Sequence, residues 1–174
     1  APVDQPAGVG SKAPRIRFEA NGPETAGRIG LWARETLKAT VGAPLTLTVW
    51  AADDFEPSLR GPAPVNLTWS KYQGPPEGMV VFAGGEAGEG TRGGPARAGP
   101  AAGAPGPVGR GGFGGGGGSG LRAPAEGGEV STTATFSAPG DYVLRVEALA
   151  SGRDSSNADQ CCWTNGYVRV TVTP

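Results

Sequence analysis

The sequence predicts an all-β fold, a sandwich of two layers with about seven strands and a long insertion rich in glycine and proline. Apolar and polar residues alternate with a period of two in short segments along the whole chain, which is typical of half-buried strands. Gly, Pro and Asn residues bound these segments and indicate turns between them. No segment carries a strong helical stripe of apolar residues.

The first half of the chain contains five of the predicted strands. In residues 45–50, leucine and valine share one face and threonines fill the other. Residues 28–38 have a slight helical periodicity, but Gly30 and the lack of a capping residue argue against a stable helix there. The five predicted strands are residues 15–20, 37–41, 45–50, 65–69 and 79–82.

The second half repeats the alternation after the insertion. Residues 130–136 alternate Val, Thr, Ala and Phe with hydroxyl side chains. A Ser-Ala-Pro-Gly turn at residues 137–140 leads into residues 141–147, and residues 167–173 end the chain with three valines facing inward. Short alternating strands separated by turns predict a sandwich or a barrel.

Two aromatic residues favour an immunoglobulin-like Greek-key sandwich. Trp69 lies in the third main strand, where that fold buries a tryptophan. Tyr142 follows a Pro-Gly-Asp turn at the start of the penultimate strand, which is the arrangement of a tyrosine corner. We expect both to lie in the core, together with Leu47 and Leu144.

Residues 133–147 resemble the E–F hairpin of bacterial extracellular polycystic-kidney-disease-type and cadherin-like modules, and residues 41–49 are similar to the start of their strand B. The resemblance covers about two thirds of the chain, excluding residues 1–14 and 84–124. It implies an extracellular module that acts in adhesion, as a spacer or as an accessory part. Leu47 and Leu144 stand where antibody domains carry their inter-sheet cysteines, so that disulfide is absent.

The predicted organisation is an extended N-terminal segment, residues 1–14, followed by one sandwich domain, residues 15–174. A low-complexity loop at residues 84–124 interrupts the domain. By composition it is a flexible loop. Its glycines also recur at every third position, a spacing that suits packing of an extended chain against a neighbouring subunit. The candidate assembly residues are Gly103, Gly106, Gly109, Gly112, Phe113, Gly115 and Gly118.

Charge and composition argue against several functions. The formal net charge of -1 does not favour binding to nucleic acid, which needs a basic field. No apolar run approaches the roughly 20 residues that cross a bilayer. The chain has no histidine, the commonest general base and metal ligand, and we therefore expect no catalytic activity. The small residue Ala1 suits a mature secreted protein.

The two cysteines, Cys161 and Cys162, are adjacent in the sequence. They allow a vicinal disulfide, disulfides to another subunit, or free thiols in a reducing compartment. Asn165 and Gly166 follow shortly after, and this pair is a hairpin-turn signal. We therefore expect a rigid loop ahead of the last strand.

Acidic and aromatic residues offer two further kinds of site. Asp53, Asp54 and Glu56 suggest calcium, yet they lack the spacing of a calcium loop, and an exposed acidic loop is the simpler interpretation. The tryptophans could form a platform for sugars or could pack on the sheets. These tryptophans are Trp32, Trp50 and Trp163.

The sequence thus predicts an extracellular structural protein that assembles with copies of itself or with another extracellular protein. Strand addition at a sheet edge is the physical route most open to a sandwich. The alternative is a carbohydrate-binding or adhesion module of a secreted protein, with calcium as a candidate stabilising ion. No other cofactor is expected.

Overall fold

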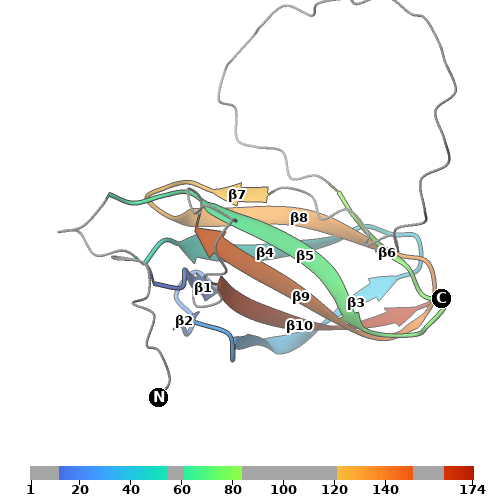
Figure 1. The fold of residues 1–174 in the computed structure, drawn as a ribbon. Coiled ribbons are helices and arrows are strands. Elements are labelled where there is room, and N and C mark those ends of the chain that lie inside the picture. The colour runs from blue at the N-terminus through green and yellow to red at the C-terminus, as the bar shows by residue number, and fades with distance from the viewer. Residues whose placement is uncertain (1–11, 55–60, 84–120, 151–162) are drawn as a thin grey trace, which may run out of the picture.

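The structure, a computed structural model, describes residues 12–54, 61–83, 121–150 and 163–174. These residues form ten strands arranged in two stacked five-stranded sheets (Figure 1). No helix in the described part of the chain is long and apolar enough to span a membrane. The prediction of an all-β fold is confirmed.

The first sheet is antiparallel throughout and has the strand order β2-β1-β4-β8-β6. Strand β4 is its central strand and pairs with β8 over most of its length. Its other neighbour, β1, is short and pairs only with the C-terminal end of β4. The strands are β1 (Arg15–Arg17), β2 (Thr25–Ala26), β4 (Leu45–Ala52), β6 (Val80–Phe82) and β8 (Gly128–Phe136).

The second sheet has the order β3-β10-β9-β5-β7. Its two longest strands, β9 and β10, are antiparallel neighbours at its centre, whereas β3 runs parallel to β10 along the edge. The strands are β3 (Leu31–Thr40), β5 (Val65–Gln73), β7 (Leu121–Ala123), β9 (Gly140–Ala150) and β10 (Trp163–Thr173).

Each of the eight segments predicted as strands overlaps a strand, but three details differ. The strand predicted at residues 37–41 begins earlier, because most of residues 28–38 lie in β3, which is held by pairing with β10. The insertion ends before residue 121, since β7 occupies 121–123 and pairs with β5. Asn165 and Gly166 form no turn and lie inside β10.

The N-terminal segment joins the fold at Pro14, whose backbone carbonyl accepts a hydrogen bond from Thr164 Oγ1.

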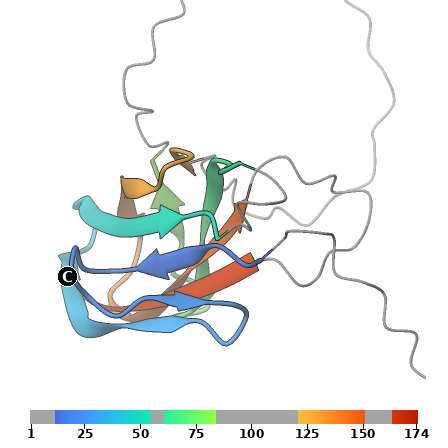
Figure 2. The same cartoon turned by 90° about the vertical axis from the view of Figure 1, so that its left-hand side faces the viewer.

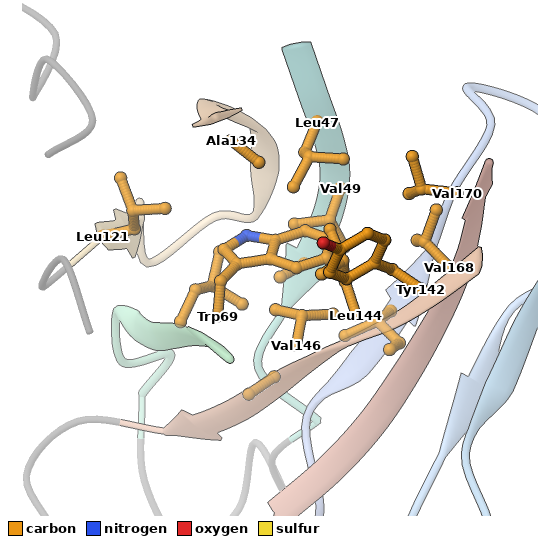
Figure 3. Packing of buried hydrophobic residues seen from close by; sticks show 14 of the residues in the cluster. Leu47, Val49, Trp69, Leu121, Ala134, Tyr142, Leu144, Val146, Val168 and Val170 are labelled. Carbon is orange, nitrogen blue, oxygen red and sulfur yellow. The ribbon is translucent and has the colours of Figure 1, made fainter. Parts of the chain in front are cut away.

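The core lies between the two sheets and contains all four predicted core residues (Figure 3). Trp69 on β5 and Leu47 on β4 face each other across the layers, with Leu144 beside them, and each is at most 1% exposed. The Tyr142 ring packs 4.9 Å from that of Phe136, and its hydroxyl donates a 2.7 Å hydrogen bond to the carbonyl of Ala138.

Gly166 lies where β10 crosses β1 too closely for a side chain. A methyl group there would stand 2.7 Å from Phe18, 2.8 Å from Ile16 and 2.9 Å from Val146. Gly166 is therefore needed because the two sheets pack closely at this position. The Asn-Gly pair resembles a turn signal but reflects this requirement for a small residue.

We expect Gly166→Ala to lower the free energy of unfolding by about 1–3 kcal/mol, because the added methyl group overpacks the core. Gly61→Ala is the matched control, since open space surrounds that position, and it should change stability by less than about 0.5 kcal/mol. Urea denaturation followed by circular dichroism measures both. Equal effects would show that the sheets do not approach closely at Gly166.

Burial raises the pKa of Tyr142 above its ordinary value of 10.0, and the charge of Glu77 adds to the shift. The folded state therefore favours the neutral phenol. The stability that this provides is complete below pH 10 and is lost as the pH rises through the folded pKa.

Tyr142→Phe should lower the free energy of unfolding by about 1–2 kcal/mol at neutral pH, because the Ala138 carbonyl loses its donor. The variant should also lose less stability than the wild type as the pH rises past the ordinary tyrosine value of about 10 into the alkaline range. Urea titrations across that range test this, and parallel pH profiles for the two proteins would contradict it.

Candidate functional site

The outer surface of the second sheet carries an exposed group of aromatic and arginine side chains. Successive side chains of a strand point to opposite faces, and on β10 the residues Val168 and Val170 are buried in the core. Tyr167 and Arg169 therefore point outward. Together with Trp32, Tyr72 and Arg145 they form what we call the aromatic face.

The three rings of the aromatic face are in contact across four strands. Pairing of β10 with β3 sets Tyr167 beside Trp32, and their rings stack with centroids 4.9 Å apart and planes inclined by 23°. On the other side, the Tyr72 ring of β5 meets Tyr167 edge-on at 5.2 Å. Strand β9 lies between them and contributes Arg145, the register partner of Tyr167.

Both arginines lie over rings of this group. The Arg169 guanidinium is 4.4 Å from the centroid of the Trp32 ring, and that of Arg145 is 6.0 Å from the Tyr72 ring. Arg145 also lies 3.8 Å from a carboxylate oxygen of Glu147. Each cation–π contact at a partly exposed site contributes about 0.5–1 kcal/mol, so the rings and guanidinium groups hold one another in a defined arrangement.

Two rings of the aromatic face are much more exposed to solvent than the aromatic rings of the core. Trp32 is 42% and Tyr72 50% exposed to solvent. The outer surface of the first sheet is different in kind, because β4 and β8 present hydroxyl groups there, with Thr48 Oγ1 and Ser131 Oγ 3.0 Å apart. The outer surface of the first sheet thus carries hydroxyl groups on β4 and β8, with Trp50, Arg15 and Arg17 at its β1 side, whereas that of the second sheet carries the two most exposed rings, Trp32 and Tyr72, beside arginines.

The three tryptophans considered for a sugar platform do not share one surface. Trp50 lies on β4 between buried neighbours that point inward, so it faces outward from the first sheet. Trp163 starts β10 and has the Arg28 guanidinium 5.0 Å above its ring. Trp32 is already engaged by Tyr167 and Arg169. A sugar stacks best on a free ring face, and this arrangement does not offer one at Trp32.

Asp53, at the end of β4, has a structural role and is buried, so it is not part of the exposed acidic loop that the sequence suggested. Asp53 is 4% exposed, and its Oδ2 accepts a 2.9 Å hydrogen bond from the Ala63 backbone N–H. This bond joins β4 to the approach to β5. In the described ranges, no three acidic, cysteine or histidine side chains gather where they could hold a metal ion. Glu56 lies outside these ranges.

The predicted disulfide and assembly residues also lie outside the described residues. They comprise Cys161, Cys162 and the insertion residues Gly103, Gly106, Gly109, Gly112, Phe113, Gly115 and Gly118. Their pairing and contacts therefore stay predictions.

Sequence reasoning missed four members of the aromatic face: Tyr72, Arg145, Tyr167 and Arg169. A signal for three of them was present, since Arg145 alternates with Leu144 and Val146 in one predicted strand, and Tyr167 and Arg169 alternate with the valines of the last one. Their meeting with Trp32 depends on the parallel pairing of β3 with β10, which no local pattern encodes.

Comparison with known proteins gives no relative to interpret this face, because neither a protein-family model nor a curated protein matches the chain.

The contact between Trp32 and Tyr167 should appear as an energetic coupling. A double-mutant cycle with Trp32→Ala and Tyr167→Ala should give a coupling of about 0.5–1.5 kcal/mol in unfolding free energy, as for other stacked aromatic pairs. The cycle of Trp50→Ala with Tyr167→Ala is the control, because those residues lie on opposite surfaces. A coupling near zero for both pairs would contradict the stack.

Proposed function

We propose that this protein is a non-catalytic extracellular structural subunit, built on an immunoglobulin-like sandwich, that assembles with copies of itself through the aromatic face. The observation that carries the proposal is the cluster of two tyrosines, one tryptophan and two arginines on one sheet, in which the Trp32 and Tyr72 rings are exposed.

The strand order supports the immunoglobulin-like assignment. Strands β1, β4, β8 and β6 lie in the positions of strands A, B, E and D, and β10, β9 and β5 in those of G, F and C. The hydrogen bond from Tyr142 to Ala138 is the contact expected of a tyrosine corner. This agrees with the resemblance to bacterial polycystic-kidney-disease-type modules, which in turn supports an extracellular location.

The composition of the aromatic face supports a protein partner. Trp, Tyr and Arg are the residues most enriched at the energetic centres of protein interfaces. Beside the face, the Glu147 carboxylate on β9 lies 3.8 Å from the Arg145 guanidinium, and Asp141 on the same strand accepts a hydrogen bond from Thr171 Oγ1. A two-fold interface places the same patch on both subunits, so these charges can pair across it.

The alternative function is carbohydrate binding or adhesion at the same surface. The half-exposed ring of Tyr72 favours it, because among the described residues Tyr167 meets that ring edge-on and the Arg145 guanidinium lies 6.0 Å from its centroid. Calcium would enter this alternative only as a stabilising ion.

Sedimentation velocity over a range of protein concentrations tests the proposal. The wild type should form dimers or larger species, and the double variant Trp32→Ala/Tyr72→Ala should need at least about tenfold more protein to do so, since hot-spot truncations weaken interfaces by about 2 kcal/mol or more. Thr133→Ala, on the outer surface of the first sheet, should associate like the wild type.

A wild type that stays monomeric at every concentration would contradict assembly. Glycan-array binding that is lost in the same double variant would then establish the alternative function. Equal association of all three proteins would place the interface elsewhere on the molecule.

A further inference from the structure

A hollow on the outer surface of the first sheet has Trp50 of β4 in its wall. Its volume is about 310 Å³, within the range of about 300–1,000 Å³ that is common for small-molecule pockets. The other large side chains of the wall are Arg15 and Arg17 on β1, Glu24 just before β2, and Glu126 in the turn between β7 and β8. We call it the Trp50 pocket. Figure 2 shows β1 (blue) beside β4 (teal) at this side of the sheet.

The pocket is open because the residues between these side chains are small. They are Ala51, Ala52, Gly127 and Gly128. The turn that carries Glu126 packs tightly on β4, since a methyl group at Gly127 would stand 2.7 Å from the Cβ of Ala52. Gly127 also has a φ of +85°, and its N–H donates a 2.9 Å hydrogen bond to the Pro124 carbonyl. Glycine is therefore required there, and the closed turn fixes the position of Glu126.

Glu24 holds the two arginines of the pocket in place. Its Oε1 lies 3.1 Å from Nη1 of Arg15, and its Oε2 lies 3.8 Å from Nη1 of Arg17. Each guanidinium group has five N–H donors, so one carboxylate leaves several of them available. Arg17 is the register partner of Trp50, and register partners lie side by side on the same face of a sheet. The pocket therefore combines fixed hydrogen-bond donors with an apolar ring.

The Trp50 ring has no stacking partner of its own. Among the described residues, neither an aromatic ring nor a guanidinium group stacks on it. By contrast, Trp32 and Trp163 each have an arginine over the ring. Glu126, together with Glu129, the register partner of Trp50 on β8, adds carboxylate acceptors around the ring. An unstacked indole, donors and acceptors thus meet at one place.

We infer that the Trp50 pocket binds a neutral saccharide through a glucose-type ring stacked on the indole. A hexose with equatorial hydroxyl groups presents C–H groups on its faces, which pack on an aromatic ring, and hydroxyl groups around its rim. Those hydroxyls both donate and accept, so they match carboxylates and guanidinium groups alike.

The charges in the wall of the pocket favour a neutral ligand. Two arginines are balanced by Glu24 and Glu126, so no net field attracts an ion. The pocket lies on the opposite sheet from the aromatic face, and the inference does not depend on the proposed function.

Isothermal calorimetry on the full chain tests this with cellotetraose and maltotetraose as neutral probes and tetragalacturonate as the anionic probe. The wild type should bind at least one neutral probe more tightly than the anionic one. In ¹⁵N-labelled protein, that probe should shift the indole N–H signal of Trp50, which is assigned by its loss in Trp50→Tyr.

Trp50→Ala should weaken this binding by at least about tenfold, because the stacking surface is lost. Trp50→Tyr keeps a ring and should bind within about threefold of the wild type. Glu126→Ala removes one acceptor at an exposed turn and should weaken binding by about fivefold even if Trp50→Ala fails to fold. Trp163→Ala is the matched control on the other sheet and should bind like the wild type.

The variant Trp32→Ala/Tyr72→Ala should also bind the saccharide like the wild type, which separates this site from the aromatic face. Loss of binding in that variant, with normal binding by Trp50→Ala, would overturn the inference and place saccharide binding on the aromatic face. It would also be overturned by no binding of either neutral probe, by tighter binding of tetragalacturonate, or by equal binding of the wild type and the Trp50→Ala and Glu126→Ala variants.

Discussion

The register of β10 determines both the packing of the core and the outer surface of the second sheet. Its inward positions hold Val168, Val170 and Val172 in the core, and the inward position at Gly166 lets β1 come close. Its outward positions hold Tyr167 and Arg169. A shift of one residue would exchange the two sets, exposing the valines and burying a guanidinium group without a partner. The same pairing that builds the core therefore also builds the aromatic face.

Most of the fold could be predicted from the sequence, because local patterns of apolar and polar residues mark most of the strands. Alternation marks both partners of the long antiparallel pairs β4–β8 and β9–β10, and the Pro-Gly turn before Tyr142 places that ring at a strand start. Prediction from local patterns failed where a contact with a residue distant in the sequence determines the role of a residue. Gly166 resembles a turn residue until its contact with Phe18 is known, and Trp32 lies in a segment of slight helical periodicity that becomes a strand only through pairing with β10.

The candidate site was less predictable than the core for the same reason. A buried valine can be predicted from the alternation within its own strand, whereas an exposed cluster can be predicted only when the order of the strands in the sheet is known. Tyr72 and Trp32 are 40 positions apart in the sequence and meet only through Tyr167. The sandwich thus presents one surface on which hydroxyl groups lie beside Trp50, one of rings and arginines, and an incomplete edge between the sheets. The second carries the most exposed rings, Trp32 and Tyr72, together with cations, which is why the proposed interface is placed there.

Hydroxyl-radical footprinting tests the central claim most directly, because it reports the solvent exposure of individual side chains in solution. Trp32 and Tyr72 should be oxidised readily in dilute protein and much more slowly at concentrations where the chain associates. Trp50, on the outer surface of the first sheet, should be oxidised at the same rate in both conditions. Unchanged rates at Trp32 and Tyr72 in the associated protein, or protection of Trp50 instead, would contradict the assignment of the aromatic face as the interface.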